Sequence, residues 1–176
     1  MTGNHCNYYS FGVLLMAVIG KKGGSAVKRE EHREEGLKAL DQCEYMVLAM
    51  TDLAGEPYCV PLNAVRVGEA IYFHCARAGE KLDCLRAHPA VCLTAVGEQH
   101  VVQAEYTTHF TSAVVRGRAA EVTDPSEIRR GLRAICAKYT PDCPGRVEEV
   151  IEKYLPAVSV WRVDLTSVSG RRKENG

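Results

Sequence analysis

Residues 57–81 contain two apolar segments, a tight turn and the start of a helix, and this order constrains the fold more than any other stretch. The two segments flank Gly68 and are rich in valine, isoleucine, tyrosine and phenylalanine, which is typical of paired strands joined by a short turn. A loop of small residues follows, and Lys81 then opens a short helical pattern that Pro89 ends. The stretch predicts an antiparallel hairpin that runs directly into a cationic helix start.

The rest of the chain also alternates between strand and helix patterns. Six strands are expected, at 45–51, 58–67, 70–74, 90–96, 111–122 and 158–165. Helices are expected at 28–42, at 81–88, after Asp124-Pro125 and at 146–155, and aspartate followed by proline is a favoured helix N-terminus. Six strands with short connections favour a mainly β fold, a six-stranded antiparallel barrel with peripheral helices.

The chain length of 176 residues indicates one ordinary domain with short extensions. We expect an N-terminal extension over residues 1–27, a barrel domain over 28–168 and a basic tail over 169–176. The apolar run at 8–19 is shorter than the about 20 residues of a membrane span. It also lacks the preceding positive charge of a signal peptide. We therefore expect no membrane partner.

Charge and cysteine content exclude several classes of protein. Lysine and arginine total 22, as do aspartate and glutamate, so the formal net charge is zero. General nucleic-acid binding relies on excess positive charge and is not expected. The eight cysteines include no C-x-x-C pair, which argues against a zinc ribbon or a thioredoxin-type site. Reduced thiols in the cytoplasm, and no metal site, are the expected state.

Lys81 is the first candidate ligand-binding residue. It stands at a helix start, where free backbone N–H groups and the helix dipole attract phosphate. Gly79 and the small residues before it would let a ligand approach the backbone closely. Arg77, Arg116 and Arg118 are further phosphate candidates. Arg116 and Arg118 share a strand face, for which a solvated surface is the favoured explanation.

The order of several motifs resembles the nitroimidazole-resistance (Nim) group of the FMN-binding split barrels, the family named after pyridoxamine 5'-phosphate oxidase. The matching fragments are V-P-L-N at 60–63, I-Y-F-H at 71–74, A-x-x-G-x-K-L-D-x-L at 76–85, P-x-V-C at 89–92, T-S-A-V-V-R-G-R-A at 111–119 and K-Y-T-P at 138–141. The resemblance extends from about residue 28 to residue 167. It implies a split β-barrel and a homodimer that binds FMN at the subunit interface.

The resemblance also implies which residues bind the cofactor. The strand of Val60, Pro61, Leu62 and Asn63 would lie along the flavin ring, and the segment of His74, Cys75 and Ala76 would pass the ring and the ribityl chain. Lys81 would bind the phosphate, and the strand start at Thr111 and Ser112 would face the cofactor. Trp161 would reach the partner's flavin. His74 is the candidate catalytic residue, because a histidine beside the flavin can position or protonate a bound substrate.

The resemblance implies an FMN-dependent oxidoreductase that reduces a small organic acceptor, with a nitroaromatic compound as one candidate. Two alternatives stay open: a barrel that holds flavin or haem for electron transfer without turnover, and a reductase that uses a deazaflavin coenzyme. Oxidation of pyridoxine phosphate is not expected. True pyridoxamine-phosphate oxidases carry an arginine and a lysine beside the strand that corresponds to Val60–Ala64, and both are absent here.

Overall fold

The computed structural model describes residues 26–174, which form seven strands and four α-helices. The strands are β1 Met46–Thr51, β2 Pro57–Leu62, β3 Ala64–Val67, β4 Ala70–Ala76, β5 Ala90–Val102, β6 Thr107–Glu121 and β7 Val158–Lys173. The helices are α1 Ala26–Gln42, α2 Glu80–Ala87, α3 Pro125–Tyr139 and α4 Val147–Tyr154. Most of the predicted N-terminal extension, residues 1–25, lies outside the described residues, and the division into domains stays a prediction.

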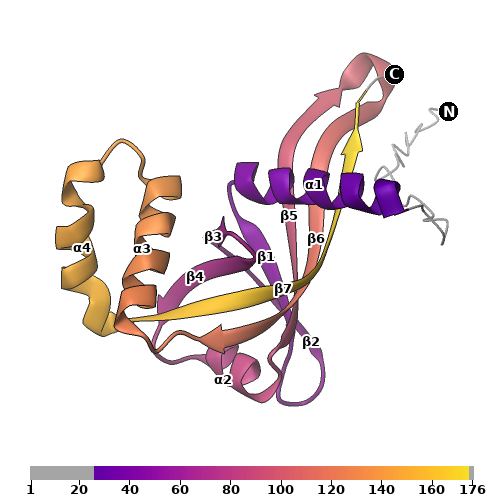
Figure 1. Ribbon diagram of the computed structural model, residues 1–176. Coiled ribbons are helices and arrows are strands. Elements are labelled where there is room, and N and C mark those ends of the chain that lie inside the picture. Colours follow the sequence, from indigo (N-terminus) through magenta and orange to yellow (C-terminus); the bar gives the residue numbers. More distant parts are fainter. Residues whose placement is uncertain (1–25, 175–176) are drawn as a thin grey trace, which may run out of the picture.

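The seven strands form one antiparallel sheet in the order β2-β1-β5-β6-β7-β4-β3. Its two edge strands follow each other in the chain, separated only by Asn63, so the sheet curls until its edges meet at this residue. One apolar cluster fills the interior with side chains from six strands and from α1 and α2. This arrangement confirms the predicted mainly β, antiparallel split barrel with peripheral helices (Figure 1).

The sheet has seven strands rather than the six that the sequence pattern predicts. The expected strand at 58–67 is in fact two strands, because β2 pairs with β1 whereas β3 pairs with β4. A strand that changes partners to close a barrel must break its own ladder, and the break falls at Asn63. Pro61 lacks a backbone N–H, which suits its position on an edge strand.

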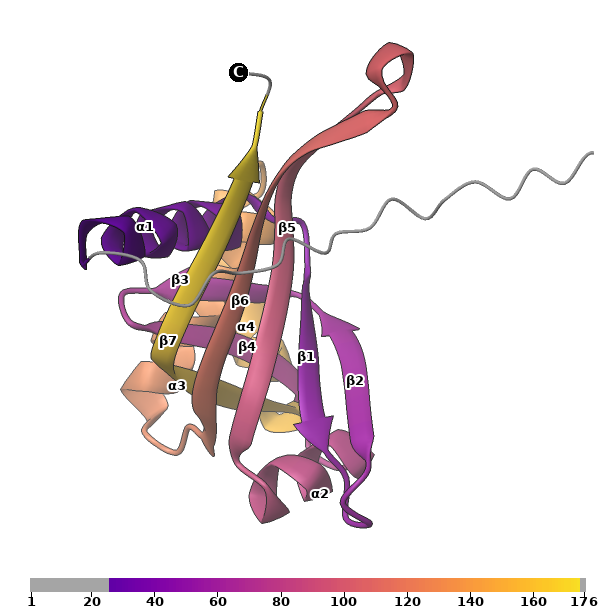
Figure 2. The same ribbon diagram turned by 90° about the vertical axis from the view of Figure 1, so that its right-hand side faces the viewer.

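Four strands are longer than predicted, β4 by two residues only, and two of the others form a projecting arm. Residues 97–110 continue β5 and β6 as a hairpin, with His100 opposite His109, beyond the body of the barrel (Figure 2). Solvent reaches both faces of this arm, so its sequence does not need the apolar alternation that marks a half-buried strand. The last strand also continues past residue 165 to Lys173, and most of the predicted basic tail therefore pairs with β6.

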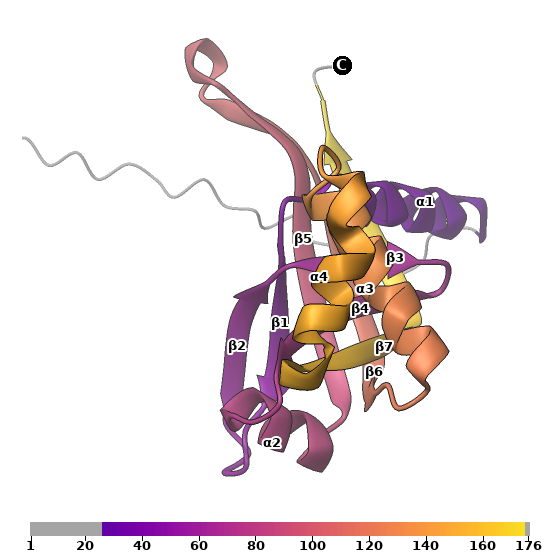
Figure 3. The same cartoon turned by 90° about the vertical axis from the view of Figure 1, so that its left-hand side faces the viewer.

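The helices cover different parts of the barrel. α1 crosses the strands near the arm, α2 lies at the opposite end, and α3 and α4 lie side by side over β4 (Figures 1 and 3). A second apolar cluster joins this helix pair to the outer sheet face, where Tyr72 and Val160 pack with Leu132 and Ile151. α3 begins as predicted, because the Asp124 carboxylate accepts a hydrogen bond from the backbone N–H of Glu127 at 2.7 Å.

One sheet face carries no helical cover within the described residues. Figure 2 looks onto the outer side of β1, β5 and β6, where Tyr45, Val96 and Val114 are 54%, 43% and 47% exposed. A hollow of about 540 Å³ lies on this face beside Tyr45 and Val96. No helix between residues 26 and 174 combines the length and the apolar character that a bilayer crossing requires.

Candidate functional site

Lys81 lies in the first turn of α2, beside a hollow of about 240 Å³. The hollow is lined by the start of β2, the end of β4 and the loop into α2: Tyr58, Cys75, Ala76, Ala78, Gly79, Glu80, Lys81 and Leu82. The Lys81 ammonium lies 5.9 Å from the centroid of the Phe73 ring. No carboxylate among residues 26–174 forms an ion pair with it, so its charge is available to a ligand.

The start of α2 is open towards an anion. Gly79 precedes the helix with a φ of 133°, a backbone conformation that glycine adopts without strain, and it has no side chain to cap the helix. The N–H groups of the first turn are therefore left without a side-chain acceptor from the N-cap position. Glu80 lines the same hollow, and its negative charge opposes the binding of an anion. The backbone N–H groups must therefore assist Lys81 in binding one.

A chain of side-chain contacts fastens α2 to the barrel. The Arg86 guanidinium, on α2, lies 3.1 Å from a Glu121 carboxylate oxygen, and Ser159 donates a hydrogen bond of 2.6 Å to the other oxygen. Trp161 Nε1 in turn donates to the Ser159 hydroxyl at 3.0 Å. These contacts lower the pKa of Glu121, chiefly through the Ser159 hydrogen bond. Sequence reasoning missed this support, since its members come from three separate elements.

His74 and Cys75 are neighbours in β4 but face opposite sides of the sheet. Cys75 lines the hollow and packs towards the barrel interior, where burial raises the pKa of its thiol. A protonated thiol is a weak nucleophile, which argues against thiolate chemistry here. His74 is exposed on the other side of the strand, and partial burial together with the Lys81 charge lowers the pKa of its imidazole.

The predicted ring-binding strand is the free edge of the sheet. β2 pairs with β1 alone, so its other edge presents unpaired backbone groups. Val60 and Leu62 are half-buried and pack against the core, whereas Pro61 and Asn63 are exposed. An apolar strand with open backbone donors and acceptors can bind a flat, polar-edged ring.

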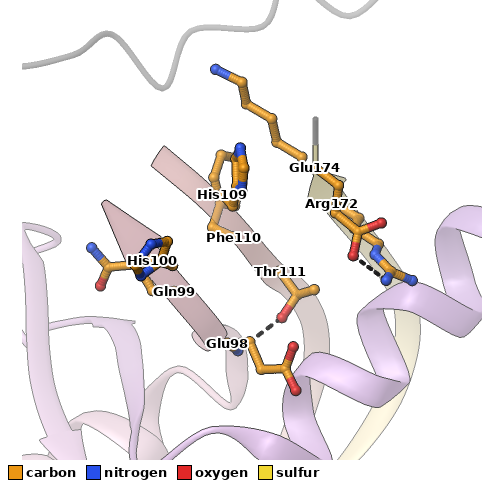
Figure 4. A pocket seen from close by; sticks show the side chains of 9 residues that line it. Glu98, Gln99, His100, His109, Phe110, Thr111, Arg172 and Glu174 are labelled. Carbon is orange, nitrogen blue, oxygen red and sulfur yellow. Dashed lines mark hydrogen bonds and ion pairs between the residues drawn. The ribbon is translucent and has the colours of Figure 1, made fainter. Parts of the chain in front are cut away.

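Two predicted cofactor residues lie at the other end of the barrel. Thr111 and Ser112 pair with Arg172 and Arg171 near the end of β7, whereas Cys75 pairs with Ser159 near its start. Thr111 is 8% exposed, and its hydroxyl accepts a hydrogen bond of 3.0 Å from the backbone N–H of Glu98 (Figure 4). One protomer therefore does not bring this pair to the Lys81 hollow.

Trp161, the remaining predicted residue, belongs to the barrel core. It is 2% exposed, and the Arg86 guanidinium lies 6.0 Å from its ring centroid. Its position fits a role in holding α2 through Ser159 better than direct contact with a ligand. No group of three possible metal ligands occurs among the described residues.

Comparisons with known proteins agree with this architecture. The family model described as pyridoxamine 5'-phosphate oxidase matches residues 32–172. No curated protein matches the sequence.

Several solved structures share the fold. A candidate 5-nitroimidazole antibiotic resistance protein from Bacteroides thetaiotaomicron is 25% identical, with a TM-score of 0.61 over 83% of this chain and 82% of that chain. The flavocytochrome Anf3 from Azotobacter vinelandii is 22% identical, with a TM-score of 0.66 over 81% and 68%. An FAD- and haem-binding protein from Mycobacterium smegmatis is 20% identical, with a TM-score of 0.65 over 81% and 72%.

Proposed function

The chain belongs to the pyridoxamine 5'-phosphate oxidase family, and from this premise we propose that it is an FMN-dependent oxidoreductase that reduces a small organic acceptor. The unpaired ammonium of Lys81 at the open start of α2 carries the proposal, because this arrangement suits the phosphate of a mononucleotide. The 25% identity to a candidate nitroimidazole-resistance protein favours a nitroaromatic compound as the acceptor class.

The residues of this chain fit FMN in three places. Lys81 and the first-turn N–H groups of α2 would hold the phosphate. The backbone of Cys75 and Ala76 would flank the ribityl chain, and the free edge of β2 with Asn63 would meet the ring. When bound, FMN supplies electron transfer to and from the acceptor, and the protein supplies orientation and exclusion of water.

His74 is proposed to handle the proton that accompanies reduction. The lowered pKa keeps its imidazole neutral at pH 7, so one ring nitrogen carries a proton while the other accepts a hydrogen bond. A neutral imidazole can orient an acceptor through hydrogen bonds, and its unprotonated nitrogen can take a proton from water and pass it to the reduced acceptor. Oxidation of pyridoxine phosphate is not part of the proposal, since the arginine and lysine that flank the corresponding strand in true oxidases are absent beside Val60–Ala64.

The proposed active unit is a homodimer with FMN at the subunit interface. The uncovered face of β1, β5 and β6 exposes Tyr45, Val96 and Val114, and a second copy would bury these side chains. Thr111 and Ser112 lie far from Lys81 along the barrel, so they would contribute to a cofactor that the partner's Lys81 holds. We propose the cytoplasm as the location of this dimer.

The test is a visible absorption spectrum of the purified protein, before and after incubation with FMN and removal of excess ligand. We expect a flavin spectrum and release of FMN on denaturation, identified by mass. Bound flavin that, once reduced, is reoxidised by a nitroaromatic acceptor supports the enzyme. Bound flavin that transfers electrons to no small acceptor indicates the electron-transfer alternative, and protein that stays colourless refutes flavin binding altogether.

A further inference from the structure

Resting on the proposed function, we infer that Tyr139, assisted by Lys138, positions the ring end of the flavin site. Both residues stand at the C-terminal end of α3, on an element that contributes nothing to the Lys81 hollow. Their contacts converge on Ala64, the residue that follows Asn63 and begins β3.

One phenol hydroxyl serves both backbone groups of Ala64. The Tyr139 oxygen accepts a hydrogen bond from the Ala64 N–H at 3.0 Å and donates one to the Ala64 carbonyl at 2.9 Å. Ala64 is fully buried, and β3 is an edge strand whose ladder partner is β4 alone. The hydroxyl therefore replaces a missing neighbour strand for two backbone groups that would otherwise be buried without partners.

Lys138 connects the same point to a second helix. Its ammonium donates to the Ala64 carbonyl at 3.1 Å and to the Leu40 carbonyl near the end of α1 at 3.2 Å. A cation close to the last carbonyls of a helix also stabilises the helix dipole. The two side chains thus fasten β3, α1 and α3 together at one residue.

The ring-binding segment pairs with β1 as far as Leu62, and Asn63 lies between this ladder and the one that β3 forms with β4. Pro61 lacks an N–H group, and within residues 26–174 no hydrogen bond holds the Asn63 side chain. The position of Asn63, at the end of β2, consequently depends on how the next residue, Ala64, is held. Tyr139 does not reach the proposed ligand itself, so its role is positioning.

The experiment compares binding of FMN and riboflavin, which share the ring but differ in the phosphate. We expect Tyr139→Phe to raise the dissociation constants of both ligands by roughly tenfold, measured by quenching of flavin fluorescence, because both hydrogen bonds to the Ala64 backbone are lost and the segment shifts. Lys81→Met should weaken FMN binding alone. Loss confined to FMN in Tyr139→Phe, or no loss, would overturn the inference.

Tyr154→Phe is the matched control. Tyr154 is a 51% exposed tyrosine on α4 whose ring lies 5.1 Å from the Lys153 ammonium, and its variant should bind both flavins as wild type does. If Tyr139→Phe does not fold, Lys138→Met replaces it: equal weakening of both ligands supports the inference, and unchanged binding contradicts it. Wild-type protein that binds neither flavin refutes the proposed function instead, which separates the two failures.

Discussion

At the phosphate end of the proposed site, charged side chains hold a helix in place, whereas at the ring end the Tyr139 hydroxyl and the Lys138 ammonium hold the backbone itself. Arg86 and Glu121 fasten α2, which carries Lys81. Tyr139 binds the N–H and the carbonyl of Ala64 directly. Ion pairs at a protein surface respond to pH and salt, and hydrogen bonds to a buried backbone respond to neither. Changes of pH and salt should therefore weaken the binding of the phosphate end of the ligand more than the binding of its ring end.

Along β4, His74 follows Phe73, which pairs with Ala64, and precedes Cys75, which lines the phosphate hollow, while its side chain is exposed on the opposite face of the strand. His74→Asn should lower kcat for a nitroaromatic acceptor by about a hundredfold, the usual contribution of a proton donor, while FMN affinity stays at the wild-type value. Stopped-flow reoxidation of the reduced flavin and a binding titration measure the two quantities. A loss of FMN affinity equal to the loss of rate would place His74 in cofactor binding instead.

Lys81→Met removes the charge at the phosphate end. We expect FMN affinity to fall by about 2 kcal/mol, roughly thirtyfold, because a charge-assisted hydrogen bond to phosphate is lost. Riboflavin affinity should not change, and Lys153→Met, on α4, should leave both ligands unaffected. Equal weakening of FMN and riboflavin by Lys81→Met would show that Lys81 does not act at the phosphate end alone.

Glu121→Gln tests whether the support of α2 matters to its ligand. Ser159 and Arg86 lose a charged partner, so α2 should become less well placed and FMN should bind about threefold more weakly, as expected for a partly exposed pair. Isothermal titration in low and high salt checks this. High salt should remove the difference between variant and wild type, and a difference that persists would point to a contact other than the ion pair.

Acid should weaken the contacts of two carboxylates and leave those of Tyr139 unchanged. The Tyr72 hydroxyl first, and then Arg162, hold the pKa of Glu127 below its usual value of 4.5, and Ser159 and Arg86 do the same for Glu121. A lowered folded pKa stabilises the protein above pH 4.5, and this stabilisation is lost as the pH falls through the lowered value. Glu127→Gln should therefore flatten the fall in Tm between pH 5 and pH 3 by about 2 to 4 °C.

Tyr139→Phe is the contrasting variant in the same series of thermal melts. It should lower Tm by a similar amount at every pH, because the two hydrogen bonds that it removes involve no carboxylate. Parallel curves for wild type and Glu127→Gln would contradict the assignment of the acid response to this carboxylate.

Local signals predicted the start of α2 well. The helix expected at 81–88 begins at Glu80, and its start follows from Gly79 and the apolar spacing after it, all within a few neighbouring residues. The ring end depends on where distant strands meet. A single expected strand at 58–67 gave no sign of a change of partner at Asn63. The resemblance implied that Thr111 and Ser112 face the cofactor, and their distance from Lys81 within one protomer became visible only with the sheet register.

The hydrogen bonds between Tyr139 and Ala64 could not be predicted from the sequence either, because they also depend on where distant segments meet. A tyrosine at the end of an amphipathic helix is usually a packing residue, and nothing in its neighbours specifies a bond to a residue 75 positions earlier. The buried N–H of Ala64 likewise looks like any strand donor until the sheet order shows that β3 is an edge.

The contact between Ala64 and Tyr139 also sets an order of assembly. The first two strands can pair soon after synthesis, but the backbone at Ala64 gains its partner only when α3, 75 residues later, has been made and has docked. A nascent chain should therefore acquire flavin affinity late, after most of the barrel exists. Hydrogen exchange at the Ala64 amide would report this step directly, because its protection depends on α3 and not on a neighbouring strand.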